Sequence, residues 1–178
     1  MKRRILSILL VLAMCLTLLP TAAGAIEYPN PALTEATIGS TTLASGTYYV
    51  IGDNGQLSTD SASETNYNVY YNTDETGAHS LTLNNANLKS PIYVLGGTTV
   101  TLVGQNFGGS ETSKVAIGIQ GITPGSITIT GTGSYTAYST NEGIATVQKD
   151  SGNDVLSDIV IQGGTISLPG SSIDTRYG

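Results

Sequence analysis

The 178-residue chain has few of the residues from which proteins build disulfides and histidine-based sites. Cys15 is the single cysteine and His79 is the single histidine. One histidine excludes a zinc site with several histidines and leaves no second one to pair with the nucleophile of a catalytic triad. We therefore interpret His79 as a solvated turn residue.

Charged residues are also scarce, at 11% of the chain, and acidic residues outnumber basic ones by 13 to 7. The basic footprint of a nucleic-acid-binding protein is absent, and an anionic membrane surface would repel such a chain. Solubility must then come largely from serine, threonine and asparagine on outward faces. We expect neither nucleic acid nor, once the N-terminal segment is removed, a membrane as partner.

Residues 1–25 have the pattern of a secretory signal peptide. Lys2, Arg3 and Arg4 precede an apolar run from Ile5 to Leu19, and Ala23-Gly24-Ala25 is a cleavage sequence. The apolar run is shorter than the roughly 20 residues that a membrane-spanning helix needs. We expect a signal helix that is cleaved after Ala25 and a secreted or cell-surface protein. The segment resembles the export signals of Gram-positive bacteria.

Cleavage after Ala25 would change the composition of the chain. Cys15, an ordinary residue of the apolar run rather than a lipoprotein cysteine, is lost, so no disulfide can form. Four basic and thirteen acidic residues remain, a formal net charge of −9.

Short runs in which apolar and polar residues alternate predict an all-β fold. They are Leu81–Leu83, Ile92–Val94, Val100–Leu102, Ile117–Ile119, Ile127–Ile129, Ile159–Ile161 and Ile166–Leu168. Four of them begin at Leu81, Val100, Ile127 and Ile159, at spacings of 19, 27 and 32 residues. Such spacings are typical of stacked repeats, whereas a hairpin sandwich turns about every 8 to 12 residues. An antiparallel sandwich remains the alternative.

Turn residues separate these runs. Asn84, Asn85 and Asn87 suit tight corners because asparagine tolerates left-handed backbone geometry. Gly96-Gly97 and Gly163-Gly164 suit further corners in the same way.

The region before residue 79 is less regular. Leu43, Tyr48–Ile51 and Tyr67–Tyr71 are expected strands, and Asp53-Asn54-Gly55 is an expected turn. Five of the ten tyrosines lie between Tyr48 and Tyr71. They fit an aromatic platform for sugar rings or a cap over the first repeat, and we favour the cap because terminal repeats are atypical.

Four segments carry a resemblance to a known group of proteins: SLTLNNANL, TTVTLVGQN, SITITGTGSYTAY and DIVIQGGTISL. They resemble the repeats of right-handed parallel β-helices (β-solenoids) in bacterial secreted proteins, a group with pectate-lyase-like enzymes, carbohydrate-binding domains and surface adhesins. The implied organisation is a signal peptide (1–25), a lead-in with irregular N-terminal cap strands (26–78), β-helix coils (79–168) and a tail (169–178).

The resemblance does not extend to a catalytic motif. Lys89, Lys114, Lys149 and Arg176 are the only basic residues after the signal peptide, and no acid recurs at equivalent positions of successive repeats. We therefore expect a non-catalytic, carbohydrate-binding or adhesin-like protein whose partner is a polysaccharide or a host or cell-surface glycan. One alternative is part or a relative of a polysaccharide lyase or glycoside hydrolase that acts on acidic polysaccharide. The other is a purely structural stalk.

Two tyrosines and one acidic loop are the candidate binding residues. Tyr93 and Tyr138 should point outward next to core positions and could contact sugar rings. Asp150, Asp154 and Asp158 supply oxygen ligands suited to a weak Ca²⁺ site. A solvated loop is the favoured interpretation, because Gly152 occupies a position where an EF-hand has an acid or amide. No other cofactor is expected.

Two further expectations concern the core and the tail. Ile129 should face inward and stack near Leu102 and Ile161. Residues 169–178 contain no segment long enough to cover an apolar coil, so we expect further coils and an attachment module beyond Gly178. A tail that folds back with Ile173 and Tyr177 as a plug is the alternative.

Overall fold

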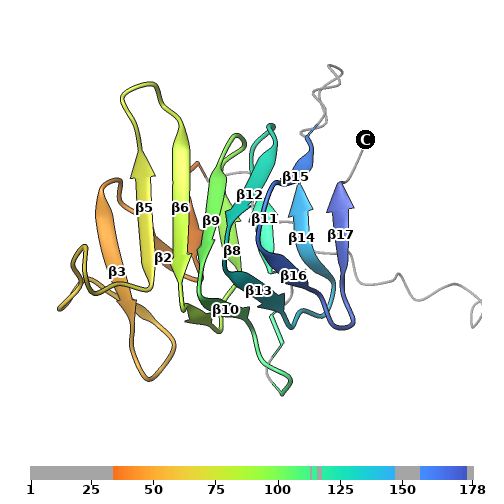
Figure 1. The fold of residues 1–178 in the computed structure, drawn as a ribbon, viewed down its shortest axis with the longest axis horizontal. Coiled ribbons are helices and arrows are strands. Elements are labelled where there is room, and N and C mark those ends of the chain that lie inside the picture. Colours follow the sequence, from red (N-terminus) through yellow and green to blue (C-terminus); the bar gives the residue numbers. More distant parts are fainter. Residues whose placement is uncertain (1–33, 113, 116–117, 147–156, 176–178) are drawn as a thin grey trace, which may run out of the picture. The chain divides into compact units, whose positions relative to one another are not determined.

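The computed structural model describes residues 34–112, 114–115, 118–146 and 157–175. Within these residues the chain is all-β, as predicted, with seventeen strands in three sheets (Figure 1). Every described residue belongs to one compact unit. No helix among them is long and apolar enough to cross a membrane. The expected signal peptide, Asp150, Asp154 and Tyr177 lie outside the described residues.

The largest sheet contains strands from the whole described region, which Figure 1 shows side by side. In spatial order it consists of β15 (Ile159–Ile161), β12 (Ile127–Gly131), β9 (Thr99–Val103), β6 (His79–Asn84), β5 (Val69–Thr73), β3 (Thr47–Ile51) and β4 (Leu57–Ser58). We call it the seven-stranded sheet.

The other two sheets are built from the strands that follow. The six-stranded sheet consists of β17 (Ser172–Thr175), β14 (Glu142–Thr146), β11 (Ile119–Gly121), β8 (Ile92–Val94), β1 (Thr37–Ile38) and β2 (Thr41–Thr42). The four-stranded sheet consists of β16 (Thr165–Ser167), β13 (Ser134–Ala137), β10 (Gln105–Gly108) and β7 (Asn87–Leu88).

From β6 to β14 each strand pairs in parallel with the strand three places later in the chain. Of every three consecutive strands, one therefore belongs to each of the three sheets. The next three strands pair with them in the same order. An antiparallel sandwich does not describe these strands, because their pairs are parallel.

The strands before β6 pair differently. β5 and β3 extend the seven-stranded sheet with antiparallel pairs, and β1 extends the six-stranded sheet in the same way. Among the described residues, the four-stranded sheet has no such extension and ends at β7. Asp53-Asn54-Gly55 forms the predicted turn between β3 and β4, closed by a 2.8 Å hydrogen bond from Gly55 N to Gly52 O.

The predicted register is right in part. Ile129 is fully buried and pairs with Ile161, as predicted, but its other partner is Val100 and not Leu102. Leu102 pairs with Gly131, so the spacing from Val100 to its partner is 29 residues rather than 27. The error arose because Ile127 and Ile129 both continue the alternation, and the sequence pattern alone does not distinguish a slip of two residues.

Asn85 is the one corner asparagine with left-handed geometry, at a φ of 49°. Asn87 was also predicted as a corner residue, but it lies within β7. Its side chain is exposed while Leu88 is buried, so the alternation continues through this position.

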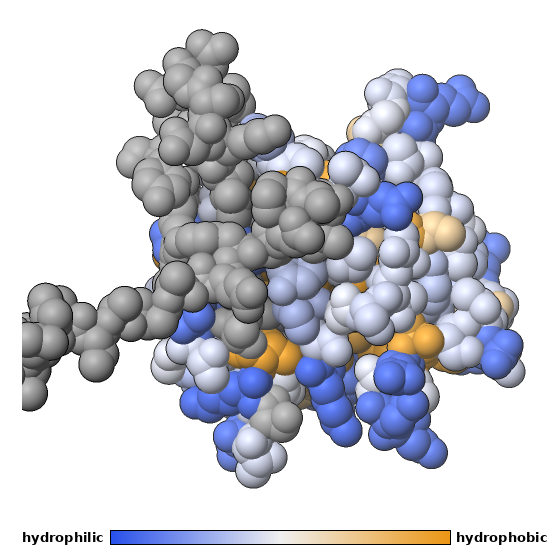
Figure 2. Space-filling view, turned by 180° about the vertical axis from the view of Figure 1, so that it is seen from behind, coloured by the Kyte–Doolittle hydropathy of each residue, from blue (hydrophilic) through white to orange (hydrophobic). Residues whose placement is uncertain are grey.

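Aliphatic side chains from successive strands form one buried core, centred on Leu81, Val100, Ile129, Leu88 and Ile144. Outward positions are mostly polar, and Figure 2 shows that the visible part of the opposite face is largely hydrophilic or neutral, with small separate apolar patches. Apolar inward positions become exposed at the last strands: Ile161 is 45% and Ile173 44% exposed.

Candidate functional site

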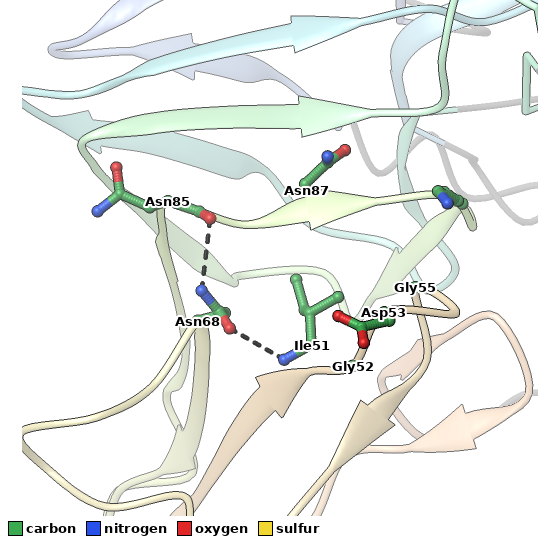
Figure 3. Close-up of a pocket in the computed structure, with 8 residues that line it drawn as sticks. Ile51, Gly52, Asp53, Gly55, Asn68, Asn85 and Asn87 are labelled. Carbon is green, nitrogen blue, oxygen red and sulfur yellow. Dashed lines mark hydrogen bonds between the residues drawn. The ribbon is translucent and has the colours of Figure 1, made fainter.

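A polar pocket of about 250 Å³ lies beside β7, the end strand of the four-stranded sheet (Figure 3). One wall comes from β7 and its flanking residues and the other from β3 and the turn that follows it. No residue of β10 lines it, so it lies on the side of β7 away from β10. The lining residues are Ile51, Gly52, Asp53, Gly55, Asn68, Asn85, Asn87 and Lys89.

Hydrogen bonds of Asn68 hold the two walls together. Its Oδ1 accepts from Ile51 N at 2.9 Å, and its Nδ2 donates to Asn84 O at 3.2 Å and to Asn85 O at 3.4 Å. Figure 3 shows the bonds of Asn68 to Ile51 and to Asn85, which run to opposite sides. This amide therefore has a structural role: it holds the two pocket walls in position when no ligand is bound.

Asn85 is a second fixed wall residue. Its Oδ1 accepts from Gln105 N at 3.1 Å, and its Nδ2 donates to Asn84 Oδ1 at 3.1 Å. Gly104 leaves the space that this side chain needs, since a Cβ there would lie 2.1 Å from Asn85 Oδ1.

Three polar side chains of the pocket are uncommitted. The side chains of Asp53, Asn87 and Lys89 form no hydrogen bond or ion pair with the described residues. The Asp53 carboxylate can only accept hydrogen bonds, the Lys89 ammonium group can only donate them, and the Asn87 amide can do both. Ile51 adds an apolar surface, and Lys89 packs its aliphatic stem near Gly55, where an added Cβ would meet Lys89 Cδ at 3.0 Å. Together they could bind a small ligand that carries several hydroxyl groups.

A cluster of tyrosines is connected to this pocket through the chain. The rings of Tyr48 and Tyr70 stack at 4.2 Å, and Tyr67 lies 5.2 Å from Tyr48 and 6.5 Å from Tyr70. Tyr67 directly precedes Asn68, so the cluster and the pocket are joined by consecutive residues. Partial desolvation and the nearby Glu64 raise the pKa of Tyr48. We call Tyr48, Tyr67 and Tyr70 the tyrosine cluster.

The tyrosines predicted as sugar contacts lie elsewhere. Tyr93 points outward from β8 in the six-stranded sheet, and partial burial raises its pKa. Tyr138 follows β13 of the four-stranded sheet and is half-buried. Neither lines the pocket, and both stay predictions of separate contacts.

His79 is not the solvated turn residue that the sequence predicted. It is half-buried on β6, and its Nδ1 lies 2.9 Å from Tyr71 Oη and 3.0 Å from Thr73 Oγ1. These bonds attach β6 to β5, which indicates a structural role.

Asp74 and Asp158 are acidic residues that do not line the pocket. Asp74 closes the β5–β6 turn: its Oδ1 accepts from Thr76 Oγ1 at 2.7 Å, from Thr76 N at 2.8 Å and from Ala78 N at 2.9 Å. Asp158 is exposed just before β15. No group of three or more metal-binding side chains occurs within the described residues, but Asp150 and Asp154 lie outside them, so the weak Ca²⁺ site stays a prediction.

Comparisons with models of known protein families, with curated proteins and with solved structures gave no match.

The pocket was not predicted from the sequence. Its uncommitted residues come from two segments about 35 residues apart, and Asp53 and Asn87 were interpreted only as turn residues. The amide-rich stretch Asn84-Asn85-Ala86-Asn87 was a signal that could have suggested a polar site.

Proposed function

We propose that this protein is a non-catalytic carbohydrate-binding protein and that the pocket beside β7 binds one unit of a glycan. The uncommitted Asp53, Asn87 and Lys89 around Ile51 are the observation that supports it. Neighbouring sugar hydroxyls both donate and accept hydrogen bonds, which matches one acceptor, one donor and one amide. The pocket volume of about 250 Å³ lies below the range of about 300–1,000 Å³ for drug-sized ligands, so it suits a single sugar ring.

An uncharged sugar fits this pocket better than an acidic one. Asp53 and Lys89 contribute opposite charges, so the lining has no net charge, and the acidic chain as a whole repels polyanions. The enzyme hypothesis needs a basic groove for an acidic polysaccharide, and Lys89 is the one basic residue that lines the pocket.

The proposal includes the scaffold and the location. We infer that β6 to β17 are successive coils of a right-handed parallel β-helix, which is supported by the parallel pairing of strands three places apart. The N-terminal pattern of Lys2 to Ala25 supports export to the medium or the cell surface.

Binding of uncharged oligosaccharides to the purified protein, measured by isothermal titration calorimetry after a glycan-array screen, tests the function. Replacement of one charged hydrogen-bonding group, in Asp53→Asn or Lys89→Met, should weaken binding about tenfold. The matched controls Asp60→Asn and Lys114→Met change exposed residues that do not line the pocket and should bind like the wild type.

Three results would contradict the proposal. Equal loss of affinity in the pocket variants and their controls would show that the pocket is not the site. Release of reducing or unsaturated ends from a polysaccharide by the wild type would show an enzyme, and absence of saturable binding to every glycan would favour a structural stalk.

A further inference from the structure

We infer that the glycan is an uncharged polymer whose chain continues from the pocket across the outward face of the seven-stranded sheet. This inference rests on the proposed function of the pocket and adds a second, extended binding surface. Its evidence comes from residues that do not line the pocket.

Two rows of hydroxyl-bearing side chains cross β6, β9 and β12 on this face. The pairings place Ser80 beside Thr99 and Thr99 beside Thr128, and in the second row Thr82 beside Thr101 and Thr101 beside Thr130. All six residues are half-buried and alternate with the core residues Leu81, Val100 and Ile129. We call them the hydroxyl rows.

Most of these hydroxyls are not used by the protein. Ser80 Oγ donates to Asn72 O at 3.4 Å. The hydroxyl groups of the five threonines form no hydrogen bond with the described residues. Because these side chains are only half-buried, their unused hydroxyls are open to water or to a ligand.

The tyrosine cluster lies at the start of the second row. Tyr48 pairs with Tyr70, and Tyr70 pairs with Thr82. Tyrosine presents an apolar ring and a polar end, which suits contact with the apolar face and the hydroxyls of a sugar. Tyr67 of the cluster directly precedes Asn68 of the pocket, so one chain segment connects the pocket to the cluster, and the pairing of Tyr70 with Thr82 connects the cluster to the second row.

The period of the rows matches a polymer. Neighbouring strands lie about 4.8 Å apart, which is close to the length of one ring in an extended glycan. Successive sugar units along a row would therefore meet the same hydroxyl and methyl groups. Neither the rows nor the tyrosine cluster contains a charged residue, so the face complements an uncharged chain and offers nothing to pair with uronates or sulfates.

The test is the dependence of affinity on ligand length, measured with the full chain by calorimetry using cello-, manno- and xylo-oligosaccharides from disaccharide to octasaccharide. For the series that binds, affinity should rise by at least about tenfold from disaccharide to hexasaccharide as each added unit gains hydrogen bonds. Thr101→Val combined with Thr130→Val should abolish most of this rise and leave disaccharide affinity unchanged. Valine keeps the β-branched shape and the preference for strands, so the fold should be retained.

Thr136→Val is the matched control, because Thr136 is an outward, half-buried threonine of β13 in the four-stranded sheet. Disaccharide binding without any gain from added units would overturn the extended surface and leave the pocket intact. An equal loss in the Thr136 variant would also overturn it. Absence of binding at every length would overturn both the extended surface and the proposed function.

Discussion

Single polar residues in the chain act through hydrogen bonds within a turn, as Asp74 does, or between distant segments, as Asn68 does. The three bonds to Asp74 Oδ1 favour the ionised carboxylate, and the Thr76 hydroxyl, followed by the Ala78 N–H, holds the Asp74 pKa below its usual value of 3.8. Tyr135 is different, because it is fully buried and its hydroxyl has no hydrogen-bond partner among the described residues. Glycine at position 108 makes room for this ring, since a Cβ there would lie 2.3 Å from Tyr135 Oη.

The depressed pKa of Asp74 predicts a pH-dependent contribution to stability. Because the folded-state pKa lies below the unfolded-state value, the stabilisation is complete above that value of 3.8 and is lost as the pH falls through the folded-state pKa. Asp74→Asn should therefore be less stable than the wild type at pH 7, and the difference should shrink below about pH 4.

Urea unfolding of both proteins between pH 2 and pH 7 would measure this difference. The exposed Asp60→Asn is the control and should show no comparable change with pH. A difference between wild type and Asp74→Asn that stays constant down to pH 2 would contradict the prediction.

Each strand of the parallel stacks has two unlike faces, and the partner strands keep them aligned. On β12, Ile127 and Ile129 are fully buried while Thr128 and Thr130 point outward.

Corners between strands need special residues as well. Buried Asn106 links neighbouring strands, with its Oδ1 accepting from Ala86 N at 2.9 Å and its Nδ2 donating to Val103 O at 3.1 Å and Ser134 O at 3.0 Å.

Because β12 has a buried and an outward face, aspartate should lower stability strongly on the first and only slightly on the second. Ile129→Asp places an unpaired carboxylate in the core and should cost about 4 kcal/mol or more of unfolding free energy. Thr128→Asp places it in contact with water and should change stability by no more than about 0.5 kcal/mol. Chemical denaturation of both variants measures this, and equal destabilisation would contradict the observed register.

In the described part of the molecule, stability should vary along the stacks. β9 is paired on both sides, with β6 and β12, whereas β15 pairs only with β12 among the described strands. Burial follows the same trend, since Ile129 is fully buried while its partner Ile161 is 45% exposed. Stacked repeats depend mainly on their neighbours, so strands with one neighbour should open more often.

Hydrogen exchange measured by mass spectrometry or NMR should therefore show faster exchange in β15, β16 and β17 than in β9, β10 and β11 of the same sample. Local opening at the less buried strands is the physical reason. Uniform protection across all six strands would contradict the prediction and indicate that the described strands unfold as one cooperative unit.

Local sequence pattern was enough to predict the all-β class, most strands of the parallel stacks, the turn at Asp53-Asn54-Gly55 and the inward position of Ile129. These features depend on the two-residue alternation of apolar side chains and on backbone preferences of asparagine and glycine, which act within a few residues. Ile92 and Val94, for example, identify β8 and the outward direction of Tyr93 without any knowledge of their neighbours.

Features that join distant segments were decided only by the tertiary structure. The pairing of Val100 with Ile129 rather than Ile127, the bonds of His79 to Tyr71 and Thr73, and the pocket shared by Asp53 and Lys89 all depend on which strands become neighbours. A slip of two residues keeps every side chain on its face, so the alternation carries no information about register between strands. Packing and the loop lengths between coils set that register, and they thereby determine which polar side chains meet at the pocket and align in the hydroxyl rows.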